Sequence, residues 1–218
     1  MPQPPFRNIF VLCTGRCGST TFAAACAHMT NWTAGHETRS HLLGTGRLAY
    51  PERHIEADNR LSWMLGRLEA AFGPEAAYIH LTRDPEAVAQ SYARRARWGI
   101  MHAYRHGLIF PTPDADGKDP RPMLSHARDM VATVTANIDA FLKDKPYVMR
   151  LRMEEAIRDF PALWDWAGAE GRLDLALQEW SIPHNRTEPE RAVAKGRVAS
   201  WPRHLRRALR WSQGHPAD

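Results

Sequence analysis

The 218-residue chain contains only three cysteines and no apolar run long enough to cross a lipid bilayer. So few cysteines exclude a disulfide scaffold and are typical of reduced intracellular thiols. The N-terminal residues MPQPPFRN lack the apolar segment of a secretory signal peptide. From these absences we expect a soluble, cytoplasmic protein without a membrane span.

The chain also lacks the runs of lysine and arginine, interleaved with aromatic residues, that mark nucleic-acid-binding segments. It is nevertheless basic, with a net charge of +5 and an isoelectric point of about 9.4. This charge balance suits a small polyanion such as a nucleotide, or an acidic acceptor. Because the chain lacks basic runs with aromatics, we predict no nucleic-acid partner beyond a nucleotide. With 44% hydrophobic residues, residues 1–218 can bury one full core, so we also predict a single domain.

A strand, a glycine-bearing turn and a helix start follow one another near the N-terminus. Ile9 to Leu12 is an apolar run that predicts a buried strand, and the alanine-rich segment after Thr21 predicts a helix. Both glycines of the intervening turn, GRCGST, permit close backbone approach. Because the first N–H groups of a helix have no internal partner and the helix dipole favours an anion, the stretch predicts a site for a phosphate or sulfate ester.

Three familiar anion-binding signatures are absent from this turn. A Walker A loop needs G-x-x-x-x-G-K-[ST], but no lysine precedes Ser19 and the span from Gly15 to Gly18 is too short. A thiol-phosphatase loop needs a cysteine six positions before an arginine, which neither Cys13 nor Cys17 provides. The dinucleotide fingerprint G-x-G-x-x-G is missing as well. The turn therefore belongs to none of these three classes.

The turn resembles the 5′-phosphosulfate loop of the sulfotransferases. In that family a strand ends in a [K/R]-x-G-[ST]-[ST] turn, which Arg16, Gly18, Ser19 and Thr20 match here. The resemblance implies that Arg16 also neutralises charge on the leaving phosphate, as a catalytic residue. It implies a donor-binding set within this loop: Arg16, Cys17, Gly18, Ser19, Thr20 and Thr21. For this stretch alone, a strand–helix corner with incidental glycines is the alternative.

A second segment repeats the arrangement of strand, turn and helix. Ala77 to Leu81 predicts a strand, Asp84 is a candidate N-cap, and Pro85 suits the first helical turn. Arg83 stands at the end of the strand, and Ser91 lies eight residues later, two turns into the helix. In sulfotransferases an arginine and a serine at this spacing hold the 3′-phosphate of the donor nucleotide, so the resemblance gives Arg83 and Ser91 that role.

A third segment lies between these two. Residues 32–39, WTAGHETR, predict a strand that is followed by Glu37. The Glu-Thr-Arg stretch resembles the one in tyrosylprotein sulfotransferases, where the glutamate is the catalytic base, which would place Arg39 at the acceptor substrate. His36 stands where that family has an acidic residue, and an imidazole suits general-base catalysis near neutral pH, so it is a rival base. Glu56 is a further rival.

Strands and helices keep alternating along the rest of the chain. The pattern predicts helices over Asp58–Phe72 and Leu124–Leu142 and a further buried strand over Tyr147–Leu151. It therefore predicts a three-layer α/β fold, with a central, mainly parallel β-sheet flanked by helices, as in the P-loop-like sulfotransferase fold. Residues 97–122 are too long for a plain connection, so we interpret them as a candidate lid or acceptor loop.

The C-terminal part matches the family less closely. Cytosolic sulfotransferases end in a G-x-x-G-x-x-K loop that reaches the 3′-phosphate, and this chain offers only Lys195-Gly196-Arg197. A basic helix is expected to begin at Trp201-Pro202. His102 and His106 have the spacing of helical metal ligands but lack a third ligand, and sulfonyl transfer does not demand a metal, so no metal is expected.

The resemblance implies a sulfotransferase that uses 3′-phosphoadenosine 5′-phosphosulfate (PAPS) as its donor and releases adenosine 3′,5′-bisphosphate (PAP). The sulfonyl group would pass by in-line displacement to a hydroxyl of a small molecule, sugar, lipid or peptide. Three alternatives stay open: a P-loop-type kinase that uses ATP, with Asp84 as the candidate magnesium ligand, a non-catalytic relative that binds an adenine nucleotide, and a basic interaction module. The sequence leaves the acceptor and the oligomeric state undetermined.

Overall fold

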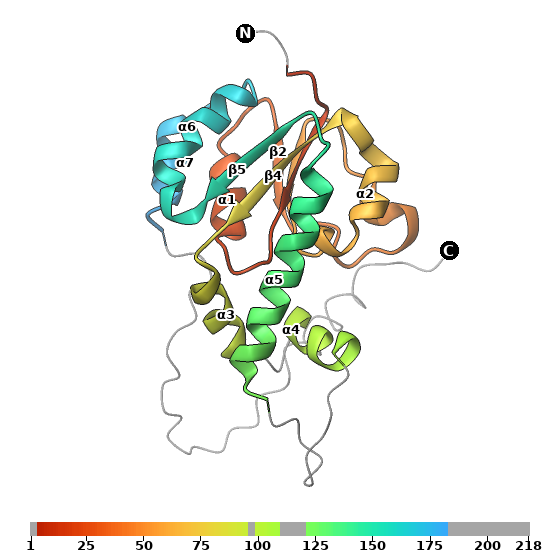
Figure 1. The fold of residues 1–218 in the computed structure, drawn as a ribbon. Coiled ribbons are helices and arrows are strands. Elements are labelled where there is room, and N and C mark those ends of the chain that lie inside the picture. The colour runs from red at the N-terminus through yellow and green to blue at the C-terminus, as the bar shows by residue number, and fades with distance from the viewer. Residues whose placement is uncertain (1–3, 96–98, 110–120, 183–218) are drawn as a thin grey trace, which may run out of the picture. The chain divides into compact units, whose positions relative to one another are not determined.

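The computed structural model describes residues 4–95, 99–109 and 121–182, and its centre is one five-stranded parallel sheet (Figure 1). The strands are β1 (Asn8–Leu12), β2 (Thr33–His36), β3 (His54–Ala57), β4 (Ala76–Thr82) and β5 (Val148–Arg152). Their order in the sheet is β2-β3-β1-β4-β5. Parallel neighbours need crossover connections, which are provided mainly by the helices between the strands.

Helices cover both faces of the sheet, as Figure 1 shows. They are α1 (Ser19–Cys26), α2 (Leu65–Phe72), α3 (Pro85–Ala93), α4 (Gly99–Ala103), α5 (Met123–Leu142), α6 (Ala156–Trp166) and α7 (Leu173–Glu179). Ile9 and Val11 of β1 belong to one buried cluster with α1, α6 and α7, whereas Phe10 and Leu12 belong to another with α2, α3 and α5. Because successive side chains of a strand point to opposite faces, β1 contributes to both layers of the core.

The strand order reverses beside β1. The chain leaves β1 for the edge strand β2, returns to β3 on one side of β1, and then crosses to β4 on the other side. In open α/β sheets a crevice forms at such a reversal, at the carboxyl ends of the strands, and ligands bind there. The turns after β1 and β4 both lie at this end of the sheet.

The predicted fold is confirmed, and several elements match within one residue. The three-layer α/β architecture is present, with a sheet that is parallel throughout. β1, β4 and α5 agree with the predicted spans, and α3 begins at Pro85, with Asp84 Oδ1 accepting a hydrogen bond from Ala87 N (2.7 Å). Strong apolar runs and a clear cap therefore carried enough local information to locate these elements.

The helix predicted over Asp58–Phe72 is wrong in its first half. α2 begins only at Leu65, after a 3₁₀ turn over Leu61–Trp63. Asp58 does not cap a helix, because its carboxylate accepts hydrogen bonds from Arg60 N (2.8 Å) and Arg47 Nη2 (3.0 Å) at the end of β3. Tertiary contacts thus decide the conformation of this segment.

Two strands also differ from expectation. β3 was missed, because its residues His54 and Glu56 are charged or polar yet buried, between the edge strand β2 and the central strand β1. The strand expected to be buried over residues 147–151 is β5, in which only Leu151 is buried. β5 is the last strand in the sheet order, and an edge strand has one unpaired side.

The described part of the candidate lid contains α4 and a π-helical turn over Tyr104–Leu108. The rest of that segment, at residues 96–98 and 110–120, lies outside the described residues, as do Lys195-Gly196-Arg197 and the basic helix expected from Trp201. The single domain and the lid stay predictions. Among the described helices, none combines the length and the apolar character that crossing a membrane requires.

Candidate active site

The turn after β1 has a backbone conformation that favours glycine. Gly15 (φ +84°) and Gly18 (φ +88°) have left-handed backbones, and Arg16 between them has φ 61°. A Cβ atom on Gly15 would overlap the Tyr92 hydroxyl and lie 2.8 Å from Asn59 Nδ2. The turn therefore needs glycine at position 15, for its backbone angle and for the space.

Side chains from two later segments hold this turn in place. The Tyr92 hydroxyl, in α3, donates a hydrogen bond to the Thr14 carbonyl (2.7 Å). Ser62 Oγ accepts a hydrogen bond from Cys13 N (3.1 Å) and donates one to Cys13 O (3.0 Å). Sequence reasoning missed Tyr92 and Ser62, because no local pattern shows which distant residues will contact a turn.

The loop offers backbone N–H groups and hydroxyls rather than its thiol. α1 begins at Ser19, directly after Gly18, so the first N–H groups of the helix lie at the carboxyl end of β1. Cys17 is fully buried in the core, and its hydrogen bond with Cys13, together with burial, raises the pKa of Cys13 well above its ordinary value. Cys17 can therefore contribute its backbone to a ligand, but its side chain packs inside the protein.

The two segments predicted to bind opposite ends of the donor meet at Arg16. Arg16 Nε donates a hydrogen bond to Ser91 Oγ (3.0 Å), and Arg83 Nη1 donates one to the Arg16 carbonyl (3.2 Å). Burial lowers the pKa of the Arg16 guanidinium, and the nearby guanidinium groups of Arg95 and Arg83 lower it further. Positive charge is thus concentrated between the carboxyl ends of β1 and β4, which an anion would stabilise.

The two candidate bases at the end of the second strand have different surroundings. His36, the last residue of β2, has its Nε2 atom 3.0 Å from Ser19 Oγ and 3.4 Å from Thr20 Oγ1. Glu37 has φ 54°, and its Oε2 atom forms an ion pair with Arg60 Nη1 (2.7 Å). The structure therefore brings His36 to the loop after β1 and directs a Glu37 oxygen to Arg60.

Arg39 and Glu56 are both engaged by their neighbours. Arg39 Nη1 donates a hydrogen bond to the Gly46 carbonyl (3.0 Å), and its guanidinium lies over the Tyr50 ring, 5.4 Å from the centroid. Glu56 is fully buried, and its two oxygens accept hydrogen bonds from Thr38. Burial argues against Glu56 as a base, whereas the acceptor role of Arg39 stays a prediction.

Sequence comparison identifies no relative of the chain, but structural comparison finds proteins of similar fold. No family model matches it, and neither does any curated protein. Its structure is similar to a sulfotransferase domain from the curacin biosynthetic pathway and to one from the olefin synthase of Synechococcus PCC 7002. Each has a TM-score of 0.56 and 16% sequence identity, with 84% of this chain and 80% of the other covered. The chain has the sulfotransferase fold.

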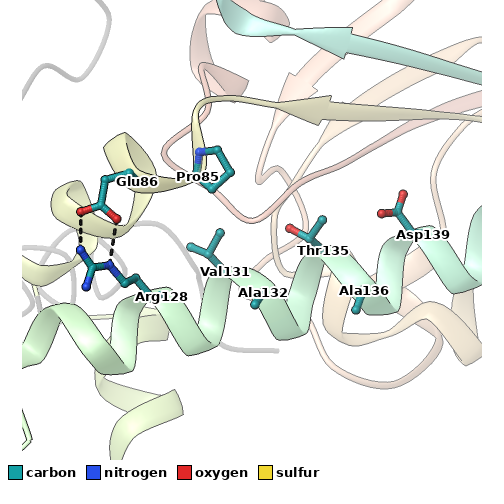
Figure 2. Close-up of a pocket in the computed structure, with 8 residues that line it drawn as sticks. All are labelled: Pro85, Glu86, Arg128, Val131, Ala132, Thr135, Ala136 and Asp139. Carbon is teal, nitrogen blue, oxygen red and sulfur yellow. Dashed lines mark hydrogen bonds and ion pairs between the residues drawn. The ribbon is translucent and has the colours of Figure 1, made fainter.

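A groove of about 410 Å³ lies elsewhere on this sulfotransferase fold, between α3 and α5 (Figure 2). Its floor is mainly small and apolar, and the ion pair between Glu86 and Arg128 lies at one end. Its lining residues are Pro85, Glu86, Arg128, Val131, Ala132, Thr135, Ala136 and Asp139. The residues predicted for the donor and the base do not line this groove, so it is separate from the candidate active site.

A metal site needs several ligating side chains close together, and the structure describes residues 4–95, 99–109 and 121–182. Within those residues, no group of three or more histidine, cysteine, aspartate or glutamate side chains is arranged to hold a metal ion. The rings of His102 and His106 lie together, with centroids 4.4 Å apart. The candidate active site is thus built from backbone amides, hydroxyls, arginines and one histidine.

Proposed function

We propose that the protein is a sulfotransferase that transfers a sulfonyl group from PAPS to an acceptor hydroxyl. One observation carries this proposal: Arg16, Ser91 and Arg83 meet beside a glycine-bearing turn, at the strand-order reversal of a sulfotransferase fold. PAPS has a phosphate at its 3′ position and a phosphosulfate at its 5′ position, so it requires two anion sites close together. The helix start at Ser19 and the arginine cluster supply two such sites.

Each end of the donor has its own set of groups in this proposal. The backbone N–H groups at the start of α1, with the Ser19 and Thr20 hydroxyls, hold the 5′-phosphosulfate. Arg83 and Ser91 hold the 3′-phosphate. Arg16 joins the two sets, because its backbone lies in the loop and its side chain contacts Ser91. Its positive charge also stabilises the phosphate oxygen on which negative charge grows during transfer.

The transfer itself is a single in-line displacement. The acceptor oxygen forms a bond to sulfur while the bond from sulfur to the 5′-phosphate oxygen breaks, and PAP leaves with that electron pair. The acceptor proton passes to a protein base. His36 is the better placed of the two candidates, because Nε2 already lies within hydrogen-bonding distance of a loop hydroxyl. Glu37 is the alternative base, and it would have to act beside its ion pair with Arg60.

A kinase that uses ATP fits the same residues less well. Such an enzyme needs a carboxylate for magnesium at the end of a strand. Asp84 caps α3, and Asp58, at the end of β3, is fully buried with its two oxygens bonded to Arg47 and to Arg60 N. Both carboxylates therefore have other partners. A requirement for magnesium together with ATP turnover would favour the kinase.

The test is a thermal-shift titration with PAP, ATP and AMP, followed by an acceptor panel with radiolabelled PAPS. A ligand that binds only the folded form stabilises it, by about 2.7 kcal/mol at 100 times its Kd. We expect PAP to raise the melting temperature more than AMP, because AMP lacks the 3′-phosphate. Equal shifts with PAP and AMP would contradict the proposed donor. PAP binding without turnover on any acceptor would indicate a nucleotide-binding relative without catalytic activity.

A further inference from the structure

The turn that follows β2 has an unfavourable backbone conformation. Glu37 has φ 54°, and a non-glycine residue in the left-handed region costs about 1–2 kcal/mol. This residue directly follows His36, whose Nε2 atom lies 3.0 Å from Ser19 Oγ. The contacts that hold the turn therefore lie next to the strand end that carries His36.

One buried side chain supplies two of the contacts that hold the turn. Glu56, in the neighbouring strand β3, accepts a hydrogen bond from Thr38 N at Oε1 (2.7 Å) and one from Thr38 Oγ1 at Oε2 (2.7 Å). Other contacts assist, because Glu37 N donates a hydrogen bond to Ala57 O (3.2 Å), Ser40 N donates one to Glu37 O (3.3 Å), and the Glu37 carboxylate pairs with Arg60. The residue after Glu37 is therefore bound through both its backbone and its side chain.

Glu56 is itself supported from the other side. His54 Nε2 lies 2.9 Å from Glu56 Oε2, and His54 Nδ1 lies 2.8 Å from Thr33 Oγ1 at the start of β2. Burial raises the pKa of Glu56, but the hydrogen bonds from His54 and Thr38 outweigh it and lower the pKa overall. The side chain is therefore a carboxylate at neutral pH, and its hydrogen-bond partners are Thr38 in the turn and His54 in β3.

We infer that Glu56 is a positioning residue, which fixes the turn after β2 through Thr38 and thereby holds His36 against the hydroxyls of the loop. The catalytic consequence rests on the proposed function, but the structural one does not. Glu56 does not itself act on the substrate, since it is fully buried beneath the turn. Loss of its carboxylate should displace His36 while leaving the Arg16, Arg83 and Ser91 contacts in place.

The first test follows the His36 ring by NMR in the full chain, with its signals assigned by their loss in His36→Gln. We expect Glu56→Ala to shift these signals. Glu56→Gln should keep them near their wild-type positions, because its amide oxygen still accepts from Thr38 N. Ile138→Val is the control, since it loosens the core at α5 and leaves β2 intact. Unchanged His36 signals in Glu56→Ala would overturn the inference.

The second test separates positioning from stability by kinetics. A displacement of a reacting group by about 1 Å can cost about 100-fold in rate. We expect Glu56→Ala to lower kcat by about 10- to 100-fold, with the KM for the donor within about twofold. A donor KM that rises as much as kcat falls would contradict the assignment, because it would mean a general loss of structure.

Thr38→Val provides a matched variant that keeps the carboxylate and the shape of residue 38. It removes one hydroxyl donor, so its effect on kcat should be smaller than that of Glu56→Ala. The double variant should be no worse than Glu56→Ala alone, since both changes break the same contact. Additive effects would overturn the inference. If Glu56→Ala does not fold, Thr38→Val and Glu56→Gln carry both tests. Absence of PAP binding in the wild type would contradict the proposed function only, because the NMR test needs no donor.

Discussion

The arginine cluster and the β2–β3 region differ in how their charged groups are paired. Around the turn after β1, the guanidinium groups of Arg16, Arg83 and Arg95 lie near one another and raise the local positive charge. Beside β2 and β3, each acidic group is paired with a cation or a histidine. The pairs are Glu37 with Arg60, Asp58 with Arg47, and Glu56 with His54.

This difference suits the arginine cluster to binding a ligand and the β2–β3 region to holding a backbone in place. Like charges held close together are stabilised by an anionic ligand, so the arginine cluster suits a site for a polyanion. Paired, buried charges gain little from a ligand, but breaking one pair is costly, and they therefore hold a backbone in one conformation. On this comparison, the loss of Arg83 from the first region should alter donor affinity, whereas changes in the second region should alter the rate.

The largest effect is expected from Gly15→Ala. The added Cβ would overlap the Tyr92 hydroxyl, and alanine would have to adopt φ +84°, so we expect a loss of about 2–4 kcal/mol in stability together with loss of PAP binding. Gly66→Ala in α2 is the control, because nothing lies within 4 Å of its Cβ position, and it should not destabilise the protein. Urea unfolding and PAP titration measure both outcomes. Full PAP binding by Gly15→Ala would show that the turn is not the anion site.

The candidate bases are compared by His36→Gln and Glu37→Gln. General-base catalysis contributes about 100- to 10,000-fold, so His36→Gln should lower kcat by that factor if the better placed residue is the base. Glu37→Gln should have a smaller effect, because its oxygen is paired with Arg60. The measurement is kcat against pH at saturating donor. The reverse order would assign the base to Glu37. It would also show that the contact of His36 with the loop does not make His36 the base.

A smaller effect is expected from the arginines. Arg83→Ala should weaken PAP binding by about 10- to 100-fold and leave AMP binding unchanged, since hydrogen bonds to charged groups contribute about 1.5–3 kcal/mol. Arg16→Ala should mainly lower kcat, with some loss of affinity because its side chain contacts Ser91. Arg128→Ala, on the exposed pair with Glu86, is the control. Equal losses of kcat and affinity in both variants would contradict these separate roles.

The smallest expected effect is on the pH dependence of the free energy of unfolding. The pKa of Glu56 lies below its ordinary value of 4.5, so the folded form binds its proton less readily than the unfolded form. The resulting stabilisation is complete above pH 4.5 and is lost as the pH falls through the lowered pKa. Urea unfolding between pH 3 and 7 should therefore show a weaker acid dependence in Glu56→Gln than in the wild type. The same acid dependence in both would mean that the carboxylate is not stabilised by its partners.

Much of the fold could be predicted from local patterns, and the site only in part. β1 and β4 follow from apolar runs and α3 from its cap residues, whereas the hydrogen bonds of Arg16 with Ser91 and Arg83 are known only from the structure. β3 could not be predicted, because a strand with buried His54 and Glu56 has no apolar pattern. Its polar side chains are stabilised by partners that the sequence does not place beside it.

The sequence alone determined that two strand–turn–helix units each carry groups suited to an anion at the turn. It could do so because glycine, proline and cap residues fix the backbone conformation of only a few neighbouring positions. Only the tertiary structure decided which candidate base lies at the loop. His36 and Glu37 are adjacent in the chain, and their separation depends on one left-handed backbone angle. That angle is held by a carboxylate from another strand, since hydrogen bonds between strands form only once the sheet has assembled.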